Sequence, residues 1–127
     1  MPFVNVKILE NQFDASKKQK LISDLTDLIV DVMNREKDLT TIVIDEIRGT
    51  SWAIGGKAIS PDTSVSFVNI KVSKGTTNTE EMAIMQKKTK KLMSRLLNNH
   101  VDENYFIIDE LNPAGWGFGD TTMAERN

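Results

Sequence analysis

The sequence predicts an α/β (α+β) fold in which two tandem β-α-β repeats form one four-stranded sheet with two helices on one face. Three observations support this prediction. The two halves of the 127-residue chain match without a gap, each half shows strand, helix and strand periodicity in that order, and no cysteine is present to build a disulfide or thiolate framework. A chain of this length buries about two-thirds of its unfolded surface, which suffices for a single domain.

The internal repeat is visible when the chain is aligned with itself at an offset of 64 residues, which places Phe3 on Phe67. Residues 3–8 then fall on residues 67–72, and residues 44–47 on residues 108–111. The other matched pairs are Leu28 and Leu92, Asn34 and Asn98, Asp38 and Asp102, Trp52 and Trp116, and Gly55 and Gly119. We therefore expect one domain, with repeat one at about residues 2–60 and repeat two at about residues 66–124.

The first element of each repeat has strand periodicity. Within residues 3–9, the aliphatic residues Val4, Val6 and Ile8 alternate with Phe3, Asn5 and Lys7, and residues 67–72 repeat this alternation. A period of two residues places the aliphatic side chains on one face of a strand. Each repeat therefore opens on a strand with one apolar face.

The second element of each repeat has helical periodicity. From Asp14 or Ser16 to about Arg35, apolar residues recur at spacings of four, three and four, as in an amphipathic helix with a polar N-cap. They are Leu21, Leu25, Leu28 and Val32. The second half has the same rhythm at Met82, Met85, Thr89, Leu92 and Leu96. Thr77 and Glu80 have the spacing of a capping box ahead of this second helix.

The third element of each repeat contains a continuous apolar run. Residues 41–47 and 105–111 carry the runs Ile42-Val43-Ile44 and Phe106-Ile107-Ile108, which predict strands buried on both faces. A helix between two strands is long enough to join them in parallel, and such crossovers are right-handed.

Two units joined through residues 60–64 give a sheet with both helices on one face, so the other face needs a cover. A closed homo-oligomer, which we expect to be a trimer, supplies it.

Composition excludes several classes of function. The chain has 16 Lys plus Arg against 18 Asp plus Glu and no basic stripe, which argues against a nucleic-acid partner. No apolar run approaches the length that spans a bilayer, and no basic and apolar leader precedes the first strand, so we expect no membrane role and a soluble, cytoplasmic protein.

Several residues together carry a resemblance to a known family. Pro2 directly follows Met1, the first strand ends Ile8-Leu9-Glu10, and an aromatic and glycine-rich segment spans residues 52–57. This pattern resembles the tautomerase superfamily, as a fused, double-length relative of 4-oxalocrotonate tautomerase. Residues 116–119 (Trp-Gly-Phe-Gly) are similar to a segment of malonate semialdehyde decarboxylase, a double-length member. The resemblance implies β-α-β units in threefold assemblies, no metal or organic cofactor, and an N-terminal proline as the catalyst.

Pro2 is the candidate catalytic residue. Removal of Met1 would leave Pro2 with a free secondary amine, and an apolar pocket lowers the pKa of an amine from about 8 toward neutrality. An amine with such a pKa can act as a general base at pH 7. The alternative is a proline that only opens a strand. A retained Met1 would make the nitrogen an amide and abolish the base. Ser66 occupies the matching position in repeat two, so we expect one active site per subunit.

An acidic substrate requires a cation, and the binding arginines of the founding tautomerase are missing. Their positions fall on Gln12 and near Thr41 in repeat one, and on Thr76 and near Tyr105 in repeat two. The arginine of the decarboxylase corresponds to Lys74, which is our carboxylate-binding candidate, with Lys71 and Arg48 as further candidates. A solvated turn residue is the alternative for Lys74, and lysine lacks the bidentate fork of arginine.

Aromatic residues are candidates for the wall of the Pro2 pocket. The resemblance assigns this role to Trp52, Trp116 and Phe118, whereas packing at a subunit contact is the alternative. The sequence does not decide which tryptophan faces Pro2. Asp38 lies near the acidic residue of the decarboxylase, but its match with Asp102 suggests a structural role. His100 stands alone, so we expect no metal site.

The sequence thus predicts an isomerase, a keto-enol tautomerase acting on a small 2-oxo or enol carboxylate through Pro2. One alternative is a decarboxylase, hydratase or dehalogenase that uses the same proline. A non-catalytic trimeric scaffold without the base is the other.

Overall fold

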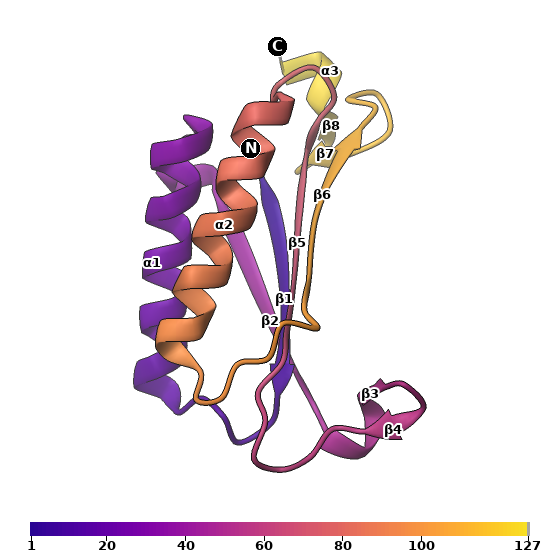
Figure 1. Ribbon diagram of the computed structural model, residues 1–127. Helices are drawn as coiled ribbons and strands as arrows, with labels where there is room; N and C mark the ends of the chain where they lie inside the picture. Colours follow the sequence, from indigo (N-terminus) through magenta and orange to yellow (C-terminus); the bar gives the residue numbers. More distant parts are fainter. Residues whose placement is uncertain (127) are drawn as a thin grey trace.

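The computed structural model describes residues 1–126 and contains two β-α-β units that lie 64 residues apart in sequence (Figure 1). The first unit consists of β1 (Phe3–Leu9), α1 (Ala15–Met33) and β2 (Thr41–Ile47). The second consists of β5 (Ser66–Ser73), α2 (Thr79–Leu96) and β6 (Tyr105–Leu111). These units confirm the predicted fold class.

Each unit is followed by a short hairpin. β3 (Ala53–Ile54) pairs with β4 (Lys57–Ala58), and β7 (Gly117–Phe118) pairs with β8 (Thr121–Thr122). The 3-10 turns η1 (Lys37–Leu39) and η2 (Gly49–Ser51) flank β2, and the short helix α3 (Met123–Arg126) follows β8. The sequence pattern does not predict α3.

The four long strands form one sheet in the order β2-β1-β5-β6. β1 pairs in parallel with β2, and β5 pairs in parallel with β6. β1 and β5 are antiparallel, with Asn5 opposite Asn69, its own match in the repeat. The two units are therefore related by an approximate twofold axis through this pair, and both helices lie on the same side of the sheet (Figure 1).

The antiparallel pairing gives the sheet two different ends. At the Pro2 end, β1 begins while β5 and β6 finish, and the β7–β8 hairpin and α3 follow. At the Ser66 end, β5 begins while β1 and β2 finish, and the β3–β4 hairpin follows. The two hairpins consequently lie at opposite ends of the molecule (Figure 1).

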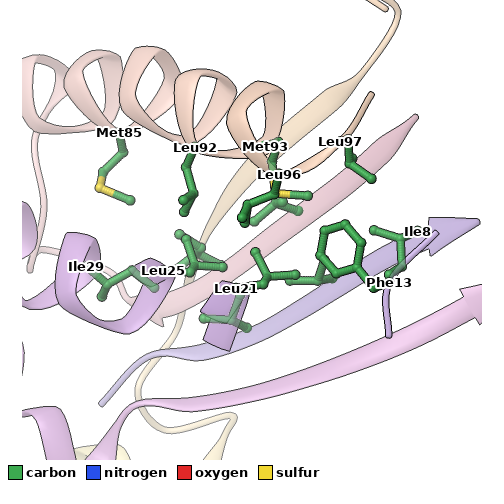
Figure 2. Close-up of a cluster of buried hydrophobic side chains, with 14 of the residues drawn as sticks. Ile8, Phe13, Leu21, Leu25, Ile29, Met85, Leu92, Met93, Leu96 and Leu97 are labelled. Atoms are coloured by element: carbon green, nitrogen blue, oxygen red, sulfur yellow. The ribbon is translucent and has the colours of Figure 1, made fainter. Parts of the chain in front are cut away.

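The core lies between the sheet and the two helices (Figure 2). The aliphatic side chains of β1 and β5 face the helices and are almost fully buried, as their alternation predicts. They are Val4, Val6, Ile8, Val68, Ile70 and Val72. Leu21, Leu25 and Ile29 of α1 and Met85, Leu92 and Met93 of α2 close the core from the other side.

Both long helices begin at a side-chain cap. The Asp14 carboxylate accepts a hydrogen bond from the Lys17 amide at 2.8 Å, and the Asn78 side-chain oxygen accepts one from the Glu81 amide at 2.8 Å. The predicted capping box of Thr77 and Glu80 is therefore wrong by one residue, because Asn78 supplies the cap. The Thr77 hydroxyl instead donates to the Glu81 carboxylate.

The second strand of each repeat is not buried on both faces within one chain, which corrects the prediction from their apolar runs. β2 and β6 lie at the edges of the sheet, and the helices cover only one face. Val43 and Ile107, on the other face, are 41% and 39% exposed. This uncovered face is called the bare face below.

Two matched polar clusters lie on the bare face. Asn5 and Lys7 donate to the Asp45 carboxylate at 2.9 and 3.0 Å. Their repeat counterparts, Asn69 and Lys71, donate to Asp109 at the same distances. These hydrogen bonds from the amide and the ammonium lower the pKa of both carboxyl groups.

Within residues 1–126, no helix has the length and the apolar character needed to cross a membrane.

Candidate functional site

A cavity of about 390 Å³ lies at the Pro2 end, next to the start of the chain. Its lining comes from both repeats, because the end of α1 and the end of β5 meet at this end of the sheet. The lining residues are Met1, Asn34, Arg35, Glu36, Leu39, Ser73, Thr76, Met123 and Arg126. The cavity therefore combines two guanidinium groups, one carboxylate and two hydroxyl groups.

Pro2 is buried and directly follows Met1, which lines the cavity, but Pro2 is not itself a lining residue. Its carbonyl oxygen accepts a hydrogen bond from the Thr41 amide at 3.2 Å, which extends the pairing of β1 and β2 by one residue. Burial and the nearby charge of Arg35 lower the pKa of the Met1 amine, Glu36 opposes this change, and Arg126 lowers the pKa further. The environment at this end thus favours a neutral amine.

The β7–β8 hairpin brings Trp116 and Phe118 to the Pro2 end. The Trp116 indole nitrogen donates to the Ser73 hydroxyl at 3.1 Å, and the Trp116 carbonyl accepts from the Met123 amide. The guanidinium carbon of Arg126 lies 4.9 Å from the centre of the Phe118 ring. Both aromatic residues therefore contact side chains that line the cavity.

Gly117 is required by the tight geometry of this hairpin. A Cβ atom at Gly117 would lie 2.3 Å from the Thr121 carbonyl oxygen, which is closer than any side chain allows. The glycine between Trp116 and Phe118 thus permits the turn that holds both aromatic residues at this end.

Trp52 lies at the Ser66 end and not with Pro2. It lines a second cavity of about 990 Å³, together with Ser66, Phe67, Tyr105 and Lys7. The sequence left open which tryptophan faces Pro2. Within one chain, Trp116 is the tryptophan at the Pro2 end.

None of the three cations singled out in the sequence lines the cavity beside Met1. Lys74 follows β5 at the Pro2 end, where its amide donates to the Leu111 carbonyl, but its side chain is exposed. Lys71 is paired with Asp109 on the bare face at 3.0 Å. Arg48 follows β2 and lines a different cavity, at the Ser66 end.

The two arginines that do line the cavity, Arg35 and Arg126, are not among the residues singled out from the sequence. A signal for Arg35 was present, because a parallel crossover returns the chain to the end where β1 began, so the residue after the helix lies near Pro2. Arg126 had no comparable signal, since it belongs to the unpredicted helix α3.

At the Ser66 end, a hydrogen-bonded network occupies the place that matches Pro2. The Ser66 hydroxyl lies 2.8 Å from Nε2 of His100, and the Lys90 ammonium lies 2.8 Å from Nδ1. Because an ammonium only donates, Nδ1 accepts and Nε2 carries the hydrogen toward Ser66. Burial, followed by the charge of Lys90, lowers the pKa of His100 to about 4. In this arrangement Nε2 donates toward Ser66 and does not accept its proton.

The two acidic residues considered in the sequence, Asp38 and Asp102, both have exposed side chains. Within residues 1–126, no group of three or more His, Cys, Asp or Glu side chains is arranged to hold a metal ion.

Comparison with protein families finds a match in the first half of the chain. Residues 2–61 match a family model described as "Tautomerase enzyme". "Probable tautomerase K2" of Dickeya dadantii is 37% identical over 60 residues, which make up 47% of this chain and 90% of that protein. A "Probable tautomerase" of Helicobacter pylori strain J99 is 38% identical over 61 residues, 46% of this chain and 90% of that protein.

Solved structures share the fold over nearly the whole chain. "F6 fused 4-OT wild type asymmetric trimer" has a TM-score of 0.83 at 17% identity and covers 98% of both chains. A macrophage migration inhibitory factor-like protein from Entamoeba histolytica has a TM-score of 0.78 at 14% identity and covers 95% of this chain and 97% of that one. N1, from the cis-3-chloroacrylic acid dehalogenase family, has a TM-score of 0.79 at 8% identity and covers 94% and 82%. At these identities the similarity concerns the fold alone.

Proposed function

Since the chain belongs to the tautomerase family, we propose that it is an isomerase that moves a proton between the keto and enol forms of a small 2-oxo or enol carboxylate. Pro2 is the general base in this proposal, after removal of Met1. The observation that carries it is the burial of Pro2 next to Met1, whose amine lines the cavity and has a lowered pKa.

The proton transfer is balanced within one amine. The neutral Pro2 nitrogen takes the proton from the enol hydroxyl, the carbon-oxygen double bond forms, and the resulting ammonium returns the proton to the neighbouring carbon. The amine ends in its starting state, so the reaction requires no second reactant. Trp116 and Phe118 support this step by holding Ser73 and Arg126, two residues that line the cavity.

The first test is the ketonisation of phenylenolpyruvate, followed by ultraviolet absorbance, with the mass of each sample measured to establish whether Met1 is present. Because the base must be unprotonated, kcat/KM is expected to rise with pH and to level off below about 8, the ordinary pKa of an α-amine. We expect the rate to level off at a pH below 8 because burial and the charges of Arg35 and Arg126 lower the pKa of the amine at the start of the chain.

The control is the same protein with Met1 retained, in which the Pro2 nitrogen is an amide. Equal activity in the two samples, or a rate that does not change with pH, would contradict the proposed role of Pro2.

A second candidate function is hydration, which the Glu36 carboxylate in the same cavity favours. A carboxylate beside the amine could activate water for addition to an unsaturated acid. Proton NMR of the protein with an α,β-unsaturated carboxylate distinguishes the two functions, since a hydroxylated product is expected only from a hydratase.

We propose further that three chains assemble through the bare face. Phe3, Val43, Tyr105 and Ile107 are exposed there, and the structures of two similar fused 4-OT proteins are described as trimers. Burying such a surface favours association. Light scattering after size exclusion is expected to give the mass of three chains, whereas Ile107→Lys should lower that mass. A monomeric wild type would refute this assembly.

A further inference from the structure

We propose that Arg35 and Arg126 together bind the carboxylate of the substrate, so that one chain supplies both cations of the site. This inference rests on the proposed function at Pro2 and adds the residues that recognise the acid. Both guanidinium groups line the cavity beside Met1, Arg35 from the segment after α1 and Arg126 from α3.

Neither arginine forms an ion pair with a carboxylate within residues 1–126, although Glu36 lines the same cavity. All six ion pairs of the described chain use a lysine, namely Lys7, Lys18, Lys20, Lys37, Lys71 and Lys90. Glu81 is near enough to Arg35 to affect its pKa, but its carboxylate accepts from Thr77. Two positive charges in one cavity repel each other, and a bound anion removes this repulsion.

Hydrogen bonds hold Arg35 in position, and some of its N–H donors have no partner. Its Nη2 donates to the Thr76 carbonyl at 2.7 Å and lies 3.1 Å from the Thr76 hydroxyl. Its Nε atom is buried without a hydrogen-bond partner. Burial lowers the pKa of Arg35, but a guanidinium stays charged at neutral pH. A carboxylate in the cavity would supply the missing acceptor.

Arg126 approaches the cavity from α3. Its guanidinium lies over the Phe118 ring, and Nη1 lies 3.4 Å from the Thr121 hydroxyl. Stacking on an aromatic face orients the plane of a guanidinium and leaves its edge free to donate. Two N–H groups on such an edge can form the bidentate hydrogen bonds that suit a carboxylate.

The offset of 64 residues gives a comparison with the Ser66 end, although Arg126 lies beyond repeat two and α3 has no counterpart in repeat one. At the offset of 64 residues, Arg35 corresponds to Asn99 and Arg126 to Asp62. At the Ser66 end, the Asn99 side chain donates to the Asp62 carbonyl at 3.0 Å. At the Pro2 end, the corresponding positions are Arg35 and Arg126, which line one cavity.

The test measures binding separately from turnover. Isothermal titration calorimetry uses 3-phenylpropionate, an unreactive carboxylate, and its neutral amide as the matched ligand. We expect Arg35→Gln and Arg126→Gln each to weaken binding of the carboxylate by about tenfold or more, with little effect on the amide. Arg95→Gln, on the outer face of α2, is the matched control and should bind as the wild type does.

Two further measurements keep the result interpretable. Arg35→Lys preserves the charge and should bind the carboxylate with intermediate affinity, which a general loss of structure would not produce. With phenylenolpyruvate, both glutamine variants should raise KM more than they lower kcat. Unchanged carboxylate binding in both variants, or an equal loss in Lys74→Gln, would overturn the proposal.

Failure of the proposed function would be recognised separately. If the wild type binds the carboxylate through the arginines but does not convert phenylenolpyruvate, the anion site stands and the role of Pro2 as a base fails. If turnover depends on Pro2 but both arginine variants keep the wild-type affinity, the role of Pro2 as a base stands and the anion site fails.

Discussion

Pro2→Ala is expected to lower kcat/KM for ketonisation of phenylenolpyruvate by a factor of about 100 or more at pH 7. A positioned general base contributes about 10²–10⁴ to a rate, and alanine replaces a rigid secondary amine by a more flexible primary one. Pro2 is buried at the start of β1, so its ring fixes the direction of the nitrogen. The initial rate, measured by ultraviolet absorbance over a range of substrate concentrations, gives the effect.

Pro61→Ala is the matched control for this prediction. Pro61 is exposed in the connection between the two repeats and does not contribute to the cavity beside Met1. Its replacement should leave kcat/KM close to the wild-type value. A Pro2→Ala protein that is folded and as active as the wild type would exclude Pro2 as the base and favour the scaffold alternative.

Leu25→Ala is expected to lower the free energy of unfolding by about 2–5 kcal/mol. Leu25 is 0% exposed at the centre of α1, where it faces α2 and the sheet (Figure 2). Truncation to alanine removes buried apolar atoms and leaves a cavity that neighbouring rigid strands cannot fill. Equilibrium unfolding in urea measures the change.

Ser23→Ala, on the exposed side of the same helix, serves as the comparison for Leu25→Ala. It should change the free energy of unfolding by less than about 0.5 kcal/mol, as surface substitutions usually do. A similar loss in both variants would contradict an origin in the core, since alanine has the highest helix propensity and Ser23→Ala removes no buried apolar group.

The fold was largely predictable because the sequence presents each element twice. Strand alternation in residues 3–9 recurs in residues 67–72, so a chance pattern in one half would not have survived comparison with the other. The same argument found the helices and the edge strands. It could not find α3, since Met123–Arg126 has no counterpart helix in repeat one.

The candidate site was less predictable because it depends on how the two repeats pair. The parallel pairing of β1 and β2 places Trp52 away from Pro2, whereas the antiparallel pairing of β1 and β5, which the sequence does not specify, places Trp116 at the Pro2 end. Arg35 is likewise distant from Pro2 in sequence and becomes its neighbour through the crossover. Resemblance to the family favoured Lys74 as the carboxylate-binding residue. In the structure, two arginines outside that family pattern line the cavity instead.

The covalent connection between the repeats sets the effective concentration of one half for the other. Arg35 comes from the first repeat, whereas Ser73, Thr76 and Arg126 come from the second. Two separate half-length chains would form this cavity only while they were associated, and dilution would separate them. Residues 60–64 make the encounter intramolecular, at an effective concentration on the order of millimolar. The cavity beside Pro2 therefore stays intact at dilutions that would dissociate an unlinked pair.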